Sequence, residues 1–121
     1  MVLDLEVADG RMHLVLANCG DAVATDIRVK FSRRLRGLGD TMAISTLPIF
    51  KSLGVLRPGK ELRVFWDTAH AIVGGREVAP FSAIVSWTEP TRSSRSRFSA
   101  TYLHNPAIYR VLPQTVDAQS S

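Results

Sequence analysis

The stretch VLDLEVADGRMHLVLA, residues 2–17, decides the fold class of this chain. Asp9-Gly10 divides it into two halves and is a dipeptide typical of a tight β-hairpin turn. Alternating apolar positions place one face of each half in a core. These positions are Leu3, Leu5 and Val7 before the turn, and Met12, Leu14 and Leu16 after it. The stretch therefore predicts an antiparallel hairpin with one buried face.

The same period of two recurs along the rest of the chain. Residues 68–73 are expected to form one helical turn, and no helix is long enough for a βαβ crossover. About seven short antiparallel strands separated by turn signals are typical of an immunoglobulin-like β-sandwich, so the fold class is predicted as all-β. We expect the sandwich to occupy residues 1–112, followed by a polar tail at 113–121. Beyond the first hairpin, strands are predicted at residues 24–32, 42–47, 61–67, 80–88 and 96–103.

Size and composition agree with a single globular domain. The chain has 121 residues, of which 45% are hydrophobic and 21% charged. A domain of this size buries roughly two-thirds of its unfolded surface, so it needs neither a disulfide nor a metal to fold. Cys19 is the only cysteine, which excludes an intrachain disulfide and favours a reducing, cytoplasmic compartment.

Two stretches resemble a known group of modules. The first, LVLANCGDAVATDIRV (residues 14–29), has a strand that ends in Asn-x-Gly and a small residue before the next strand. The second combines residues 47–50 with residues 56–62. The first resembles a signature of prokaryotic immunoglobulin-like modules, shared by CARDB-like domains and related bacterial sandwich domains. The second resembles a passage of small bacterial domains in which such a sandwich often follows a membrane helix. The resemblance implies a β-sandwich with an adhesive or scaffolding role, and a location at the membrane surface if this chain is a fragment of an anchored protein.

Residues that could carry chemistry form no recognisable motif. The histidines, His13, His70 and His104, lack the short spacing of a zinc site. No base stands beside Cys19 in the sequence to activate its thiol. The Asn18–Gly20 segment is interpreted as a turn, since Asn and Gly both tolerate left-handed backbone. We therefore expect no enzyme, no catalytic residue, no metal site and no cofactor.

Arginine is the strongest functional signal in the sequence. Net charge is +4, from 15 basic and 11 acidic residues. Arginine suits phosphate because its planar fork donates two parallel hydrogen bonds. If the ends of the sandwich align, two clusters would form one positive surface that binds anions, nucleic acid or anionic lipid. The clusters are Arg33, Arg34 and Arg36, and Arg92, Arg95 and Arg97.

The register of the aromatic residues argues against nucleic-acid binding, because β-surfaces that bind nucleic acid use exposed rings for base stacking. Only Phe65 among the strand aromatics falls on an outward register. The others, Phe31, Trp66, Phe81, Trp87, Phe98 and Tyr102, fall on inward registers.

The leading hypothesis is therefore a non-enzymatic module for protein interaction or assembly, with a protein partner or a second copy of itself. Exposed sheet edges recruit strands from partners, and the irregular strand at residues 42–47 is the candidate edge. The alternative is an anion- or nucleic-acid-binding domain that uses the six arginines. No small-molecule substrate is predicted.

Overall fold

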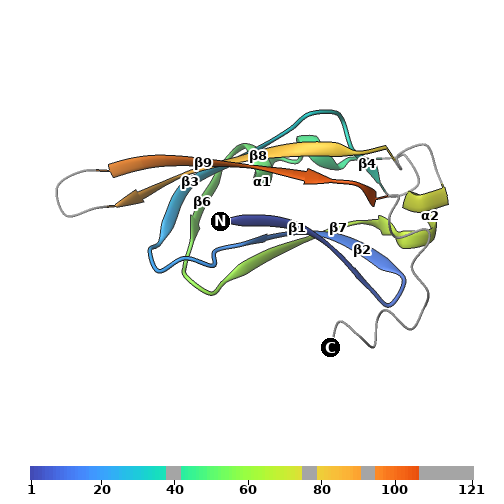
Figure 1. Cartoon of the computed structure of the whole chain (residues 1–121), viewed down its shortest axis with the longest axis horizontal. Helices are drawn as coiled ribbons and strands as arrows, with labels where there is room; N and C mark the ends of the chain where they lie inside the picture. The colour runs from blue at the N-terminus through green and yellow to red at the C-terminus, as the bar shows by residue number, and fades with distance from the viewer. Residues whose placement is uncertain (38–41, 75–78, 91–94, 107–121) are drawn as a thin grey trace.

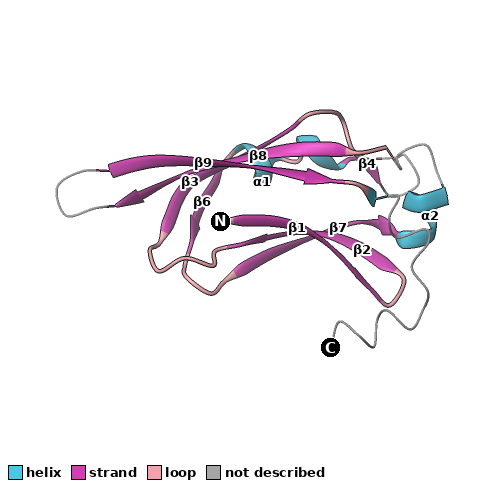
Figure 2. Ribbon diagram, viewed as in Figure 1, coloured by secondary structure: helices cyan, strands magenta, loops and turns pink. Residues whose placement is uncertain are grey.

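A computed structural model describes residues 1–37, 42–74, 79–90 and 95–106. Two antiparallel sheets pack face to face, as Figures 1 and 2 show. The predicted all-β sandwich is confirmed. The three-stranded sheet has the order β1 (Val2–Ala8), β2 (Arg11–Ala17), β7 (Glu61–Thr68). The four-stranded sheet has the order β6 (Leu53–Leu56), β3 (Ala24–Phe31), β8 (Phe81–Pro90), β9 (Arg95–His104).

The first hairpin forms as predicted. β1 pairs with β2 over seven residue pairs, from Val2 opposite Ala17 to Ala8 opposite Arg11. Asp9 and Gly10 have φ values of 53° and 73°, and two positive φ values in succession are typical of the type I′ turn that matches strand twist. The helical turn predicted at 68–73 is also confirmed, as α2 (Ala69–Gly74).

The segment between β3 and β7 differs from the prediction. Residues 42–47 contain only the two-residue strand β5 (Met42–Ala43), which pairs with β4 (Arg36–Gly37) and brings the described strands to nine. The 3-10 turn η1 (Ile44–Thr46) and α1 (Pro48–Lys51) follow. Pro48 stands in the first helical turn, where its missing N–H is not needed. The predicted edge strand at 42–47 is therefore wrong, and β6 supplies an unpredicted strand on the other side of α1.

Trp66 is the centre of the core. Its side chain is fully buried between the sheets and lies edge-on to Phe81, with ring centroids 5.7 Å apart. Its indole Nε1 donates to the Arg36 carbonyl at 2.7 Å, which satisfies the buried polar atom and fixes β4 against β7. Gly37 is required at this contact, since a Cβ there would lie 2.1 Å from the Trp66 carbonyl oxygen.

Asn18 joins two turns at one end of the sandwich, so the Asn18–Gly20 segment is a structural turn as predicted. Neither Asn18 nor Gly20 has a positive φ, however, so the left-handed backbone expected there is wrong, and side-chain hydrogen bonds hold the turn instead. Its buried amide Nδ2 donates to the carbonyls of Ala22 and Leu56, both at 2.9 Å. Its Oδ1 accepts from the Gly20 N–H at 3.0 Å. Its backbone also bonds to the turn before β7, through Gly59 and Lys60. The β2–β3 turn is thereby held against the β6–β7 turn.

Candidate interaction surface

Among the described residues, β9 is the longest edge strand of the two packed sheets. It has ten residues, and among the described strands it pairs with β8 alone, from Phe81 opposite His104 to Pro90 opposite Arg95. Between Phe98 and Leu103 it contains no charged residue, no proline and no glycine. Natural sheets usually protect long edges with charged residues, proline or bulges, so this stretch is suited to pair with another strand.

The ladder shows which backbone groups of β9 face outward. The Ser32 N–H donates to the Ser82 carbonyl at 2.8 Å, so the backbone groups of Ser82 point toward the β3 side. Hydrogen-bonded and non-bonded pairs alternate in an antiparallel ladder, so Phe81 and Ala83 bond to β9 instead. By the continuous register, Ala100 and Tyr102 turn their backbone groups toward β8. The alternate residues Arg97, Ser99, Thr101 and Leu103 turn theirs to the open edge.

The other long edges are partly engaged by contacts within the domain. On β1, the carbonyls of Met1 and Leu3 accept hydrogen bonds from the side chains of Tyr102 and His104, the latter at 2.9 Å if its Nε2 carries the proton. The Leu5 N–H donates to the side chain of Asp4. On β7, β4 crosses the edge at Trp66. β6 is only four residues long. β9 therefore stands out as the edge that can accept a strand.

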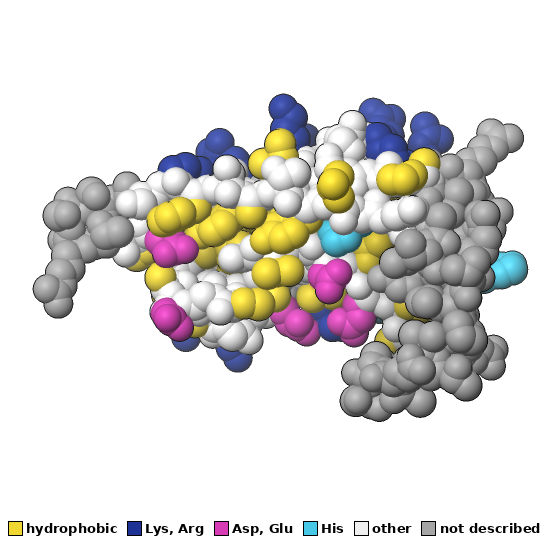
Figure 3. Space-filling model, viewed as in Figure 1, with side chains coloured by type: hydrophobic (Ala, Val, Ile, Leu, Met, Phe, Trp, Pro, Cys, Tyr) yellow, Lys and Arg dark blue, Asp and Glu magenta, His cyan; other side chains and the backbone are white. Residues whose placement is uncertain are grey.

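An apolar band follows the same side of the sandwich, in the seam between β9 and β1. Figure 3 shows hydrophobic side chains gathered there between the two sheets. Phe98 is 41% exposed and Val2 36%, and Ala100 and Tyr102 are partly buried beside them. Phe98 lies on the inward register as predicted and stacks on Trp87, with centroids 5.8 Å apart. Its ring is nevertheless not buried, so the inward register predicted for Phe98 does not place it in the buried core.

Phe65 is half-buried on the outer face of the three-stranded sheet, where its ring meets His13 edge-on at 5.6 Å. That face also carries Arg63, which bonds to Glu6 on β1 and to Glu61 on its own strand. The hydrogen bond from Arg63 holds the pKa of the Glu6 carboxyl below its ordinary value. Phe65 and these three charged residues therefore all have partners within the domain.

The predicted arginines whose side chains the structure describes do not meet on one surface. Arg33, Arg34 and Arg36 follow the end of β3, beside the start of β8, because Phe31 pairs with Ala83. Arg97 lies near the end of β8, because it pairs with Thr88. The two groups therefore stand at opposite ends of the four-stranded sheet. Arg92 lies outside the described residues, and Arg95 is described only by its place in β9 opposite Pro90.

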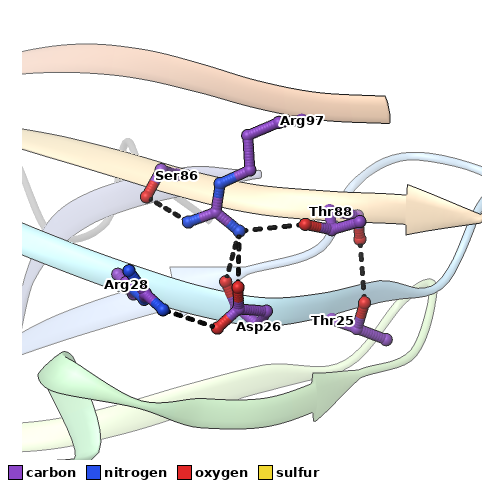
Figure 4. A network of polar contacts seen from close by, with 6 residues as sticks. All are labelled: Thr25, Asp26, Arg28, Ser86, Thr88 and Arg97. Carbon is purple, nitrogen blue, oxygen red and sulfur yellow. Dashed lines mark hydrogen bonds and ion pairs between the residues drawn. The ribbon is translucent and has the colours of Figure 1, made fainter. Parts of the chain in front are cut away.

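Arg97 has partners within the domain, shown in Figure 4. One guanidinium nitrogen donates to the Asp26 carbonyl at 2.7 Å and to the Thr88 hydroxyl at 3.0 Å, and pairs with the Asp26 carboxylate at 3.1 Å. The other donates to Ser86. Asp26 has φ 47° and stands where the β3–β8 register shifts. Arg97 thus ties an irregularity in β3 to β9 across the outer face of the sheet.

Residues considered for chemistry are dispersed in the structure. Within the described ranges, no group of three or more His, Cys, Asp or Glu could hold a metal ion. Cys19 is exposed, and His104 lies against Phe81 at the β1–β9 seam. Among the described residues, no helix has the length and apolar character to cross a bilayer.

Comparison with known proteins identifies a family whose description assigns no function. No curated protein and no solved structure matches the chain. The model of a family described as a domain of unknown function, DUF8453, matches residues 1–110. That match covers every residue of both sheets, and the chain therefore belongs to the DUF8453 family.

Proposed function

We propose that this domain is a non-enzymatic assembly module that pairs its β9 edge with β9 of a second copy. The observation that carries the proposal is the uncharged stretch from Phe98 to Leu103 on an open ten-residue edge, beside an apolar band. An edge strand is complementary to itself in the antiparallel sense, because a two-fold axis matches each outward donor with an acceptor.

A two-fold axis at Ala100 would give a pairing that uses both the uncharged edge and the apolar band. Ser99 would exchange backbone hydrogen bonds with Thr101 of the partner subunit. On the inner face, Phe98 would lie opposite Tyr102 of the partner subunit, which covers the half-exposed ring. The two four-stranded sheets would join into one of eight strands. Backbone bonds supply affinity in such strand addition, and the side chains set the register.

The strand order also supports an immunoglobulin-like assignment for the sandwich. β1, β2 and β7 would correspond to the first, second and fifth strands of that fold, and β3, β8 and β9 to its third, sixth and seventh. β6 would be the additional strand beside β3. In this arrangement β9 is the last strand of the fold and an outer edge, as the assembly proposal requires.

Thr101→Pro tests the pairing directly. Proline removes an outward N–H but leaves the β8–β9 ladder intact, because the Thr101 N–H does not face β8. We expect the wild-type chain to show a concentration-dependent dimer by size-exclusion chromatography with light scattering, unaffected by high salt. Thr101→Pro should be a folded monomer, and the matched control Thr101→Ala should still dimerise.

A second variant keeps the backbone unchanged in case Thr101→Pro is too unstable to measure. Phe98→Lys places a charge in the band where edge strands of monomeric proteins often carry one, and it should also give a monomer. A wild-type chain that stays monomeric at every concentration would contradict the proposal. So would a Thr101→Pro variant that folds and dimerises as the wild type does.

A further inference from the structure

A basic groove lies on the opposite side of the four-stranded sheet from β9. It runs between β3 and the η1–α1 segment and has a volume of about 400 Å³. This volume falls within the range of small-molecule sites. Phe50 holds α1 against β3 beside the groove, since its ring packs edge-on against Phe31 with centroids 5.1 Å apart. The lining residues are Val29, Lys30, Phe31, Arg33, Arg34, Ser45, Thr46 and Lys51.

Three cations of the groove have no acidic partner within the described part of the chain. Lys30, Arg34 and Lys51 are all exposed, and none of the ion pairs between described residues involves them. They come from three different segments, namely β3, the loop after it and α1. No described residue that lines the groove is acidic. Their charges therefore reinforce one another around one concave surface.

Arg33 differs from these three because its guanidinium is already engaged. It donates to the carbonyl oxygens of Ala79 and Pro80, at 2.5 and 3.3 Å, and lies 5.9 Å from the Phe81 ring centroid. These contacts fix the loop that carries Arg34. Arg33 thus shapes the groove and adds to its positive potential.

Neutral donors also point to this side of β3. β6 pairs with β3 only as far as Leu53 opposite Ile27, which leaves Val29 and Phe31 beyond its end. Because Ser32 bonds to β8, Lys30 does so too, and the alternation turns the N–H groups of Val29 and Phe31 toward the groove. The Ser45 hydroxyl accepts from the Leu35 N–H at 2.9 Å, so its own hydrogen remains available to donate.

We propose that this groove binds a small ligand through a phosphate or diphosphate group. Lys30, Arg34 and Lys51 supply the charge, and the Ser45 hydroxyl with the Val29 and Phe31 N–H groups supplies directed donors. Mixed charged and backbone donors are the usual partners of phosphate oxygens. The site uses two of the six arginines predicted from sequence, with lysines in place of the others. It is independent of the β9 edge, so either proposal can fail without the other.

Inorganic pyrophosphate titrated into the ¹⁵N-labelled chain tests the site by NMR. Saturable shifts are expected at the amides of Val29, Phe31 and Ser45, with weaker binding as ionic strength rises. The double variant Arg34→Ala/Lys51→Ala should bind about tenfold more weakly or worse, because each charged hydrogen bond contributes about that factor or more.

The matched control removes the same charge elsewhere. Arg57→Ala/Lys60→Ala changes two exposed cations in the β6–β7 turn, and its affinity for pyrophosphate should stay within about twofold of the wild type. Equal losses in the two double variants, or shifts spread evenly over all basic residues, would overturn the proposal.

Phosphoinositide vesicles and a short single-stranded DNA distinguish the source of the phosphate. If the groove is a small-ligand site, any vesicle or DNA that binds the chain there should be displaced by pyrophosphate. Binding of vesicles or DNA that survives both excess pyrophosphate and the Arg34→Ala/Lys51→Ala change would place phosphate recognition elsewhere and overturn the assignment.

Discussion

Replacing Asn18 tests how the two turns at one end of the sandwich are held together. Asn18→Ala removes two donated hydrogen bonds, to Ala22 and Leu56, and one accepted from Gly20. A buried hydrogen bond contributes about 1 kcal/mol net, so the three together amount to about 3 kcal/mol. For a domain of this size that corresponds to a fall in Tm of about 10 °C.

Urea unfolding followed by tryptophan fluorescence measures this loss, and the slope of unfolding free energy against urea should not change. Asn18→Asp should cost more than Asn18→Ala, because a carboxylate would face the carbonyl oxygens of Ala22 and Leu56. Cys19→Ser, at the exposed neighbouring position, is the control and should be close to neutral. A loss below about 1 kcal/mol in Asn18→Ala would refute the reasoning, because it would equal a single ordinary hydrogen bond.

Two further predictions concern the packing of β4 and the charge on β1. Gly37→Ala should cost about 2 kcal/mol or more in urea unfolding, because its Cβ would meet the Trp66 carbonyl oxygen; Gly54→Ala, where an added Cβ meets nothing within 4 Å, should cost far less. The lowered pKa of Glu6 means that its contribution to stability is present above the ordinary value of 4.5 and is lost as pH falls through the lowered value. Arg63→Gln should return the pKa of Glu6 toward 4.5 in an NMR titration, and an unchanged pKa would show that Arg63 is not the cause.

Local periodicity was sufficient to predict most of the strands. The alternation in residues 2–17 and the Asp9-Gly10 dipeptide predict the β1–β2 hairpin, because turn geometry and the period of two are both local properties. The same reasoning placed Trp66 inward, where the structure buries it fully.

Short elements were not predictable in the same way. Residues 42–47 have apolar content but too few alternating positions to separate a strand from a helical turn, and Pro48 begins a helix here. β6 has only four residues, with Gly54 in its interior, so its pairing with β3 depends on distant contacts. Such segments take their conformation from the surrounding packing.

The positions of the candidate sites depend on the order of strands in the sheets, which cannot be predicted from local sequence patterns. The sequence shows an uncharged run in β9 but not that β9 is an edge. Phe98 has an inward register, yet it remains 41% exposed. Likewise, Arg34 and Lys51 are separated in the chain by the segment that contains β4, β5 and η1, and they line one groove because α1 packs against β3. Arg97 is a reasonable candidate for binding from the sequence, but its partner Asp26 on β3 lies 71 residues away in the chain and is brought to it only by the strand order.

Amide hydrogen exchange along β9, followed by NMR at low and high protein concentration, tests the assembly proposal most directly. In the dilute monomer, Ser99, Thr101 and Leu103 should exchange rapidly because their N–H groups face the open edge, whereas Ala100 and Tyr102 should be protected by β8. At high concentration, Ser99, Thr101 and Leu103 should become protected as well. Protection of all five amides in the dilute monomer, or outward amides that stay unprotected at every concentration, would contradict the account.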